Sequence, residues 1–156
     1  MRTATEWLNE YAASHRNPVN KRLHWLCVPA IVLAVLAMLS ELPVPPPLAA
    51  LSPWFNFATL AVLGAFVYYL RLAPGLAVVA LLPLVAMLVG IASASARGLP
   101  VLPVALVVFV VAWIGQFIGH HVEGARPSFF KDLQFLLIGP LWLVATALGY
   151  QQRRSI

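Results

Sequence analysis

The sequence predicts an all-α protein, a polytopic transmembrane helical bundle of four to five spans plus an N-terminal interfacial amphipathic helix. Hydrophobic residues make up 62% of the 156 residues and charged residues only 10%, against roughly 45–50% and 25% in soluble domains. A soluble fold of this size cannot hide so much apolar surface behind so few charges. Because one span needs about 20 apolar residues, the roughly 97 apolar positions provide for four or five spans. We therefore expect a single integral-membrane domain over residues 1–156, and a soluble enzyme or nucleic-acid-binding module is excluded.

The segment 1–17 predicts a helix that lies at the membrane interface. Trp7, Leu8 and Tyr11 recur at helical spacing, and His15 follows four residues after Tyr11. An apolar face bearing aromatic residues beside a polar face is typical of helices that rest on a bilayer.

Five apolar segments follow, each long enough for a membrane helix. Asn17 is a natural N-cap and Pro18 suits the first helical position of the first segment. The proline-rich stretch 43–47 predicts a stiff turn, because consecutive prolines cannot continue a helix. The last segment is interrupted by Gly139-Pro140, so it either spans the membrane or re-enters on the same side. The predicted membrane helices are about 18–40, 54–72, 75–95, 100–120 and 133–150.

Basic residues predict which ends of the helices face the cytoplasm. Arg16, Lys21 and Arg22 precede the first span, and Arg126 and Lys131 follow the fourth, whereas the intervening proline-rich loop has neither Lys nor Arg. The positive-inside rule then places the N-terminal segment and the connection after the fourth span on the cytoplasmic side. We expect a bacterial inner-membrane protein, or an endoplasmic-reticulum protein in a eukaryote, with its site facing the cytoplasm.

All four histidines fall in the two stretches that this topology brings to one membrane face. His15 and His24 lie near the start, and His120 and His121 end the fourth span, followed by Glu123. Imidazoles with a carboxylate suit a borderline metal such as iron or zinc, although single interfacial histidines are often only anchors. His120 and Glu123 share a helix face, while His121 ranks last because adjacent helix residues point about 100° apart.

Six further polar residues have two interpretations each. They would orient the metal ligands or bind substrate. Alternatively, the tyrosine is an interface anchor, the asparagines are helix caps, the glutamine joins helices, and the two basic residues are positive-inside charges. These residues are Tyr11, Asn17, Asn20, Gln116, Arg126 and Lys131.

Two segments carry a resemblance to a known family. They read YAASHRNPVNKRLHWLCVP, from Tyr11 to Pro29, and QFIGHHVEGARPSFFKDLQFLLIGPLWL, from Gln116 to Leu143. In these segments the sequence resembles the small membrane proteins, long catalogued as a domain of unknown function, that include the endoplasmic-reticulum 2-hydroxy fatty acid dioxygenase. The two segments cover under a third of the chain, and the spans between them fit the same hydropathy plan.

The resemblance implies which residues bind metal. It assigns metal-binding and catalytic roles to His15, His24 and His120, and Glu123 matches the acidic position after the Gly-His pair, although some members have one residue more there. His121 occupies a position that varies in the family.

The resemblance also implies an activity. It is an iron(II)-dependent α-oxidation in which a 2-hydroxy fatty acid and O2 give a fatty acid one carbon shorter. The substrate's hydroxyl and carboxylate would reach an iron with open positions, while its acyl chain lies in the apolar bundle. The alternatives are a zinc-dependent membrane lipid hydrolase and a non-enzymatic small transporter or assembly protein. The sequence indicates no oligomeric state.

Overall fold

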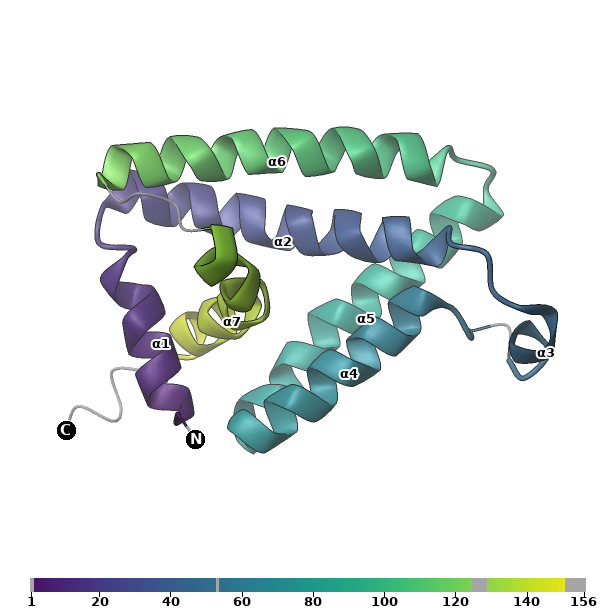
Figure 1. The fold of residues 1–156 in the computed structure, drawn as a ribbon, viewed down its shortest axis with the longest axis horizontal. Coiled ribbons are helices and arrows are strands. Elements are labelled where there is room, and N and C mark those ends of the chain that lie inside the picture. Colours follow the sequence, from purple (N-terminus) through teal and green to yellow (C-terminus); the bar gives the residue numbers. More distant parts are fainter. Residues whose placement is uncertain (1, 53, 125–128, 151–156) are drawn as a thin grey trace.

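The described part of the chain is entirely helical. The computed structural model describes residues 2–52, 54–124 and 129–150, and within them it has seven helices and no strand (Figure 1). The all-α prediction is therefore confirmed. The helices are α1 (Ala4–Ala13), α2 (Pro18–Ser40), α3 (Pro46–Ala49), α4 (Phe57–Leu72), α5 (Pro74–Ala96), α6 (Val101–Glu123) and α7 (Phe129–Ala147).

Three helices are long and apolar enough to cross a membrane. They are α2, α5 and α6, each of 23 residues. At 1.5 Å per residue each is about 34 Å long, enough for a hydrocarbon core of about 30 Å. The helix α4 has 16 residues, about 24 Å, and the apolar part of α7 is limited to Leu137–Ala147. The structure thus supports a membrane protein with three such helices, and a fourth or fifth span stays a prediction.

Two connections differ from the sequence-based expectation. The proline-rich stretch is not only a turn, because α3 forms a single helical turn that begins at Pro46. Proline is compatible with the first turn of a helix, where its missing N–H has no intrahelical partner in any case. The helix α4 begins at Phe57 rather than near residue 54, since the Asn56 side chain accepts a hydrogen bond from Thr59 N at 2.9 Å and caps it there.

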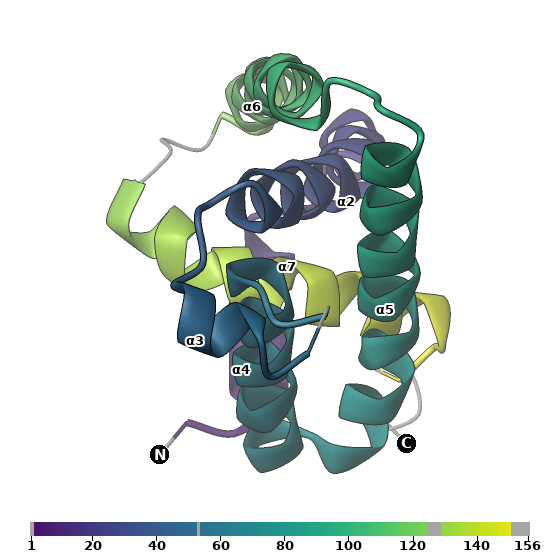
Figure 2. The ribbon, with the colours of Figure 1, turned by 90° about the vertical axis from the view of Figure 1, so that its right-hand side faces the viewer.

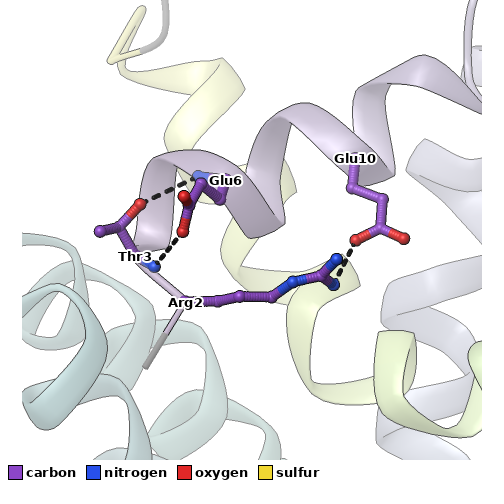
Figure 3. A network of polar contacts seen from close by, with 4 residues as sticks. All are labelled: Arg2, Thr3, Glu6 and Glu10. Carbon is purple, nitrogen blue, oxygen red and sulfur yellow. Dashed lines mark hydrogen bonds and ion pairs between the residues drawn. The ribbon is translucent and has the colours of Figure 1, made fainter.

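The amphipathic helix α1 is closed at its start by a capping box. Thr3 Oγ1 accepts from Glu6 N at 3.3 Å, and Glu6 Oε2 accepts from Thr3 N at 2.7 Å (Figure 3). Arg2 pairs with Glu10 at 2.6 Å on the exposed side. The opposite, buried face packs against α7 and ends at Tyr11. The capping box therefore stabilises the start of α1, and the last turn of this helix places Tyr11 in the interior.

The helices α2 and α6 form the most extensive helix pair in the molecule and lie side by side along their length (Figures 1 and 2). Two glycines of α6 allow this approach. A Cβ at Gly115 would lie 2.6 Å from Cys27 Sγ, and one at Gly119 would overlap Asn20 Oδ1. Small residues at a four-residue spacing are typical of close helix pairs in membranes. Because the pair is antiparallel, the start of α2 lies beside the end of α6.

The hairpin of α4 and α5 and the helix α7 complete the bundle around α2. The helix α4 contacts α5 and α2, and α7 contacts α1, α5 and α2. Tyr69 of α4 donates from its hydroxyl to the Leu137 carbonyl of α7 at 2.6 Å. The helix α7 begins at Phe129, four residues earlier than expected, and is one helix with Pro140 inside it.

Candidate metal centre

Three of the predicted histidines converge where the start of α2 meets the end of α6. His15 lies in the connection between α1 and α2, His24 in the second turn of α2, and His120 in the last turn of α6. One imidazole nitrogen from each lies within 4.8 Å of the others. His15 and His24 are 3% and 2% exposed, and His120 is partly buried. These three residues are called the histidine cluster below.

Backbone carbonyls orient two of the imidazoles. Nδ1 of His15 lies 2.6 Å from the Tyr11 carbonyl oxygen, and Nδ1 of His24 lies 3.0 Å from that of Asn20, in each case four residues earlier. A proton on Nδ1 donates to the carbonyl and leaves the lone pair on Nε2, the tautomer found in most metal-binding histidines. Nε2 of His15 is buried and has no hydrogen-bond partner among the described residues. A buried nitrogen lone pair of this kind is ready to bind a cation.

Burial also sets the protonation state of His15. The loss of solvent around the ring lowers the pKa of His15 below its ordinary value of 6.5, and the nearby His120 lowers the pKa further, against the opposing effect of the hydrogen bond to Tyr11. The imidazole is therefore neutral near pH 7. The neutral form is the one that binds a metal ion.

Aromatic rings cover the inner side of the histidine cluster. The Tyr11 ring stacks on His15 with centroids 4.2 Å apart, and Trp142 of α7 lies 5.5 Å from His15. Phe135 meets Tyr11 edge-on at 5.3 Å. The indole nitrogen of Trp142 is buried and has no hydrogen-bond partner among the described residues. The cluster is thus shielded by an apolar wall that holds one unused hydrogen-bond donor.

The carboxylate of Glu123 is engaged with the α1–α2 connection. It accepts hydrogen bonds from the backbone N–H groups of Arg16 and Asn17, both at 2.9 Å, and from Asn20 Nδ2 at 3.0 Å. Asn20 Nδ2 also lies 3.3 Å from the Ser14 carbonyl oxygen. The group of ligand atoms within 4.8 Å consists of the three histidines and does not include Glu123. Its role as a ligand stays a prediction, and its described contacts hold the segment that carries His15.

The other candidate residues lie in different places. His121 is exposed and outside the histidine cluster. Asn17 caps α2 by accepting from the N–H of the second helical residue at 2.8 Å. Gln116 is 7% exposed, one helical turn before the α6 histidine of the cluster, and its Oε1 has no partner among the described residues. Arg126 and the side chain of Lys131 lie outside what the structure describes.

One known protein family matches almost the whole chain. The family described as 2-hydroxy-palmitic acid dioxygenase Mpo1-like matches residues 1–151. The chain belongs to this Mpo1-like family. The match spans both histidine-bearing segments, so the resemblance seen in the sequence is confirmed. No curated protein and no solved structure matches the chain.

The donor set of this Mpo1-like chain fits a divalent transition metal. Nitrogens that bind one ion at about 2.1 Å in tetrahedral or octahedral geometry lie about 3.0–3.5 Å apart, so nitrogens within 4.8 Å of one another would have to approach by at most about 1–2 Å. Three histidine ligands leave further coordination positions open, as non-haem iron and catalytic zinc sites do. The histidine cluster can therefore hold a metal ion and still admit a substrate.

Sequence reasoning missed two contributors to this Mpo1-like site. A tryptophan in an apolar segment is most simply a packing or interface residue, yet the ring of Trp142 lies 5.5 Å from that of His15. Gly119 was not singled out, although its contact with Asn20 positions the start of α2. The spacing of Gly115 and Gly119 was the available signal for a close helix pair.

Proposed function

We propose that this protein is an iron(II)-dependent dioxygenase that α-oxidises 2-hydroxy fatty acids to fatty acids one carbon shorter. The observation that carries the proposal is the histidine cluster, in which one nitrogen of each imidazole lies within 4.8 Å of the others and backbone carbonyls orient two of the rings. The description of the family names a 2-hydroxy-palmitic acid dioxygenase, which supports the same reaction class.

The proposed reaction balances with one O2 per substrate. A 2-hydroxy fatty acid and O2 give the acid one carbon shorter, with the former carboxyl carbon leaving as carbon dioxide together with one water. Four electrons leave the two carbons at the cleaved bond and reduce the O2 completely. No further reductant is needed.

In this proposal the histidines bind the metal, and neighbouring aromatic rings shield it from water. His15, His24 and His120 would hold the iron, which when bound supplies the redox chemistry and the positions that receive substrate oxygens and O2. The carbonyls behind the imidazoles fix their direction. The rings of Tyr11 and Trp142 exclude water from the inner side of the cluster.

The membrane setting suits a lipid substrate. The helices α2, α5 and α6 are apolar enough to lie in a bilayer, and the cluster lies at the end of the α2–α6 pair. Together with the basic residues around this end, the positive-inside rule supports a site at the cytoplasmic face of a bacterial inner membrane, or of the endoplasmic reticulum in a eukaryote. A fatty acid in that leaflet presents its head group at the same depth.

The test combines metal analysis with oxygen uptake. Protein purified in detergent is expected to carry iron, to consume O2 when given 2-hydroxypalmitate, and to release pentadecanoate in equal amount. His15→Ala, His24→Ala and His120→Ala should each lose iron and activity together, while His121→Ala, which changes an exposed ring outside the cluster, should keep both.

Two results would overturn the proposal. One is full activity in protein that holds no transition metal. The other is product formation under strictly anaerobic conditions, which would favour the zinc-dependent hydrolase, because three histidines also suit zinc.

A further inference from the structure

An apolar cavity of about 200 Å³ lies between α2, α5 and α7. Its walls include Val28 and Val32 of α2, Ala80 of α5, and Leu143 and Val144 of α7. We propose that this cavity binds the acyl chain of the substrate, with the hydroxy acid head at the histidine cluster. The proposal rests on the proposed function and identifies which part of the bundle receives the lipid.

The cavity and the histidine cluster lie along the same face of α2. His24, Val28 and Val32 follow one another at four-residue spacing, so they lie on one face of the helix. The cavity therefore begins one helical turn, about 6 Å, beyond the His24 backbone. A substrate whose head contacts His24 has its next carbons beside Val28.

The helix α7 also runs from the histidine cluster to the cavity, on the side opposite α2. The Trp142 ring lies 5.5 Å from the His15 ring, and the next two residues, Leu143 and Val144, line the cavity. The indole N–H of Trp142 is buried beside this route and has no hydrogen-bond partner among the described residues. A carboxylate or hydroxyl oxygen of a head group at the cluster is a suitable acceptor for it.

The lining selects an apolar ligand. The side chains named above are aliphatic, and the hydroxyl of Tyr69, which also lines the cavity, already donates to the Leu137 carbonyl. Water would find few hydrogen-bond partners here, whereas a hydrocarbon chain buries its surface favourably. Among the parts of the proposed substrate, only the acyl chain fits this chemistry.

The path beyond the first cavity is long enough for a lipid chain. A second apolar cavity of about 100 Å³ shares Val32, Tyr69 and Leu84 with the first and reaches Leu36. From His24 to Leu36 the α2 backbone rises about 18 Å. Half of a bilayer's hydrocarbon core, the depth that one acyl chain occupies, is about 15 Å.

The first cavity also opens toward the side of the bundle. Trp25, Pro83 and Ala147 line it and are themselves exposed. In a bilayer this opening faces lipid, because α2 and α5 are the helices that are apolar enough to span. A fatty acid can therefore enter from the membrane without leaving an apolar environment.

A larger apolar cavity between α2, α5 and α6 is a poorer candidate. It is about 620 Å³, but its lining residues on α2 are Leu33, Ala34 and Ala37, none of which shares the face of His24, Val28 and Val32. Leu33 follows His24 by nine residues, which puts it on the opposite face of the helix, about 180° away. A chain in that cavity would not be continuous with the face that carries His24.

A cavity-filling variant tests the proposal. Ala80 is 3% exposed and lines the first cavity, so Ala80→Leu shortens the space for the chain. The ratio of kcat/KM for 2-hydroxypalmitate to kcat/KM for 2-hydroxyhexanoate should fall about tenfold or more, since excluding two methylene groups weakens binding by about that factor. Ala96→Leu adds the same side chain at an exposed position of α5 outside this cavity and should leave the ratio unchanged. An unchanged ratio in iron-loaded Ala80→Leu would overturn the proposal.

A binding experiment separates this inference from the proposed function. A 2-hydroxy fatty acid with a photoreactive diazirine on its chain should label peptides that contain Val28 or Val144, and Ala80→Leu should reduce that labelling. Labelling there without any turnover would support the cavity and overturn the dioxygenase. Turnover with labelling only around Leu33 would support the dioxygenase proposal and overturn the cavity proposal.

If Ala80→Leu does not fold, Ala147→Leu, at the exposed mouth, replaces it in both experiments.

Discussion

Asn20 of α2 lies directly against Gly119 of α6, so closely that a Cβ at position 119 would overlap Asn20 Oδ1. The same asparagine donates to Glu123 through its side chain at 3.0 Å and accepts from His24 through its carbonyl at 3.0 Å. It is fully buried. Asn20 therefore packs against α6 and binds Glu123, which holds the α1–α2 connection. Its carbonyl also orients the His24 imidazole.

Gly119→Ala is expected to damage the metal centre without touching a ligand. The added methyl group must displace Asn20, and overpacking of this kind costs about 1–3 kcal/mol of stability. Iron content and unfolding temperature should both fall. Gly90→Ala is the control, because nothing lies within 4 Å of a Cβ there. The double variant Gly119→Ala/Asn20→Ala should be less destabilised than the sum of the single variants, and strict additivity would contradict the contact.

Substitutions at Glu123 distinguish an anchor from a ligand. If its carboxylate mainly holds Arg16 and Asn17, Glu123→Gln keeps an acceptor oxygen for these N–H groups and should retain most of the bound iron. Glu123→Ala removes all three hydrogen bonds, one exposed and two partly buried, at about 0.5–1.5 kcal/mol each, and should loosen the segment that carries His15. Metal analysis of the two variants gives the answer. Complete loss of iron in Glu123→Gln would instead establish Glu123 as a ligand.

Much of this site could be predicted from residue types and topology. Charge and hydropathy placed all four histidines on one membrane face, the family resemblance singled out His15, His24 and His120 among them, and the structure brings these three together. The hydrogen bonds of Glu123 were not foreseen, because two of its three donors are backbone N–H groups, which leave no mark in a residue pattern. The Gly119–Asn20 contact depends on the distance between two helices, and periodicity alone does not give that distance.

The same limit applies to the fold. The long apolar runs predicted α2, α5 and α6 because hydropathy acts over 20 or more residues. The single turn α3 and the later start of α4 depend on a few local hydrogen bonds, such as that between Asn56 and Thr59. A hydropathy pattern is too coarse to register such bonds.

Trp142→Phe should weaken substrate binding while leaving the cluster intact. Phenylalanine keeps a ring against Tyr11 and His15 but removes the indole N–H, which has no partner among the described residues. If a substrate oxygen accepts from this N–H, its loss costs about 0.5–1.5 kcal/mol, so KM for 2-hydroxypalmitate should rise about two- to tenfold. Iron content should not change. An unaltered KM would show that the N–H does not contact substrate.

Metal removal is expected to destabilise the wild type and to leave a His15→Leu variant unaffected. A bound ion would tie together the α1–α2 connection, α2 and α6, and a ligand present at 100 times its Kd stabilises a fold by about 2.7 kcal/mol. Chelation should therefore lower the unfolding temperature of the wild type.

The His15→Leu variant should not respond to iron or chelator, and without metal it should be at least as stable as the wild type. The reason is that it removes a buried Nε2 with no described partner, while the Tyr11 carbonyl keeps a hydrogen bond from Ser14 N. Thermal unfolding of both proteins, with and without iron, measures this difference, and a metal-free variant much less stable than the metal-free wild type would contradict it.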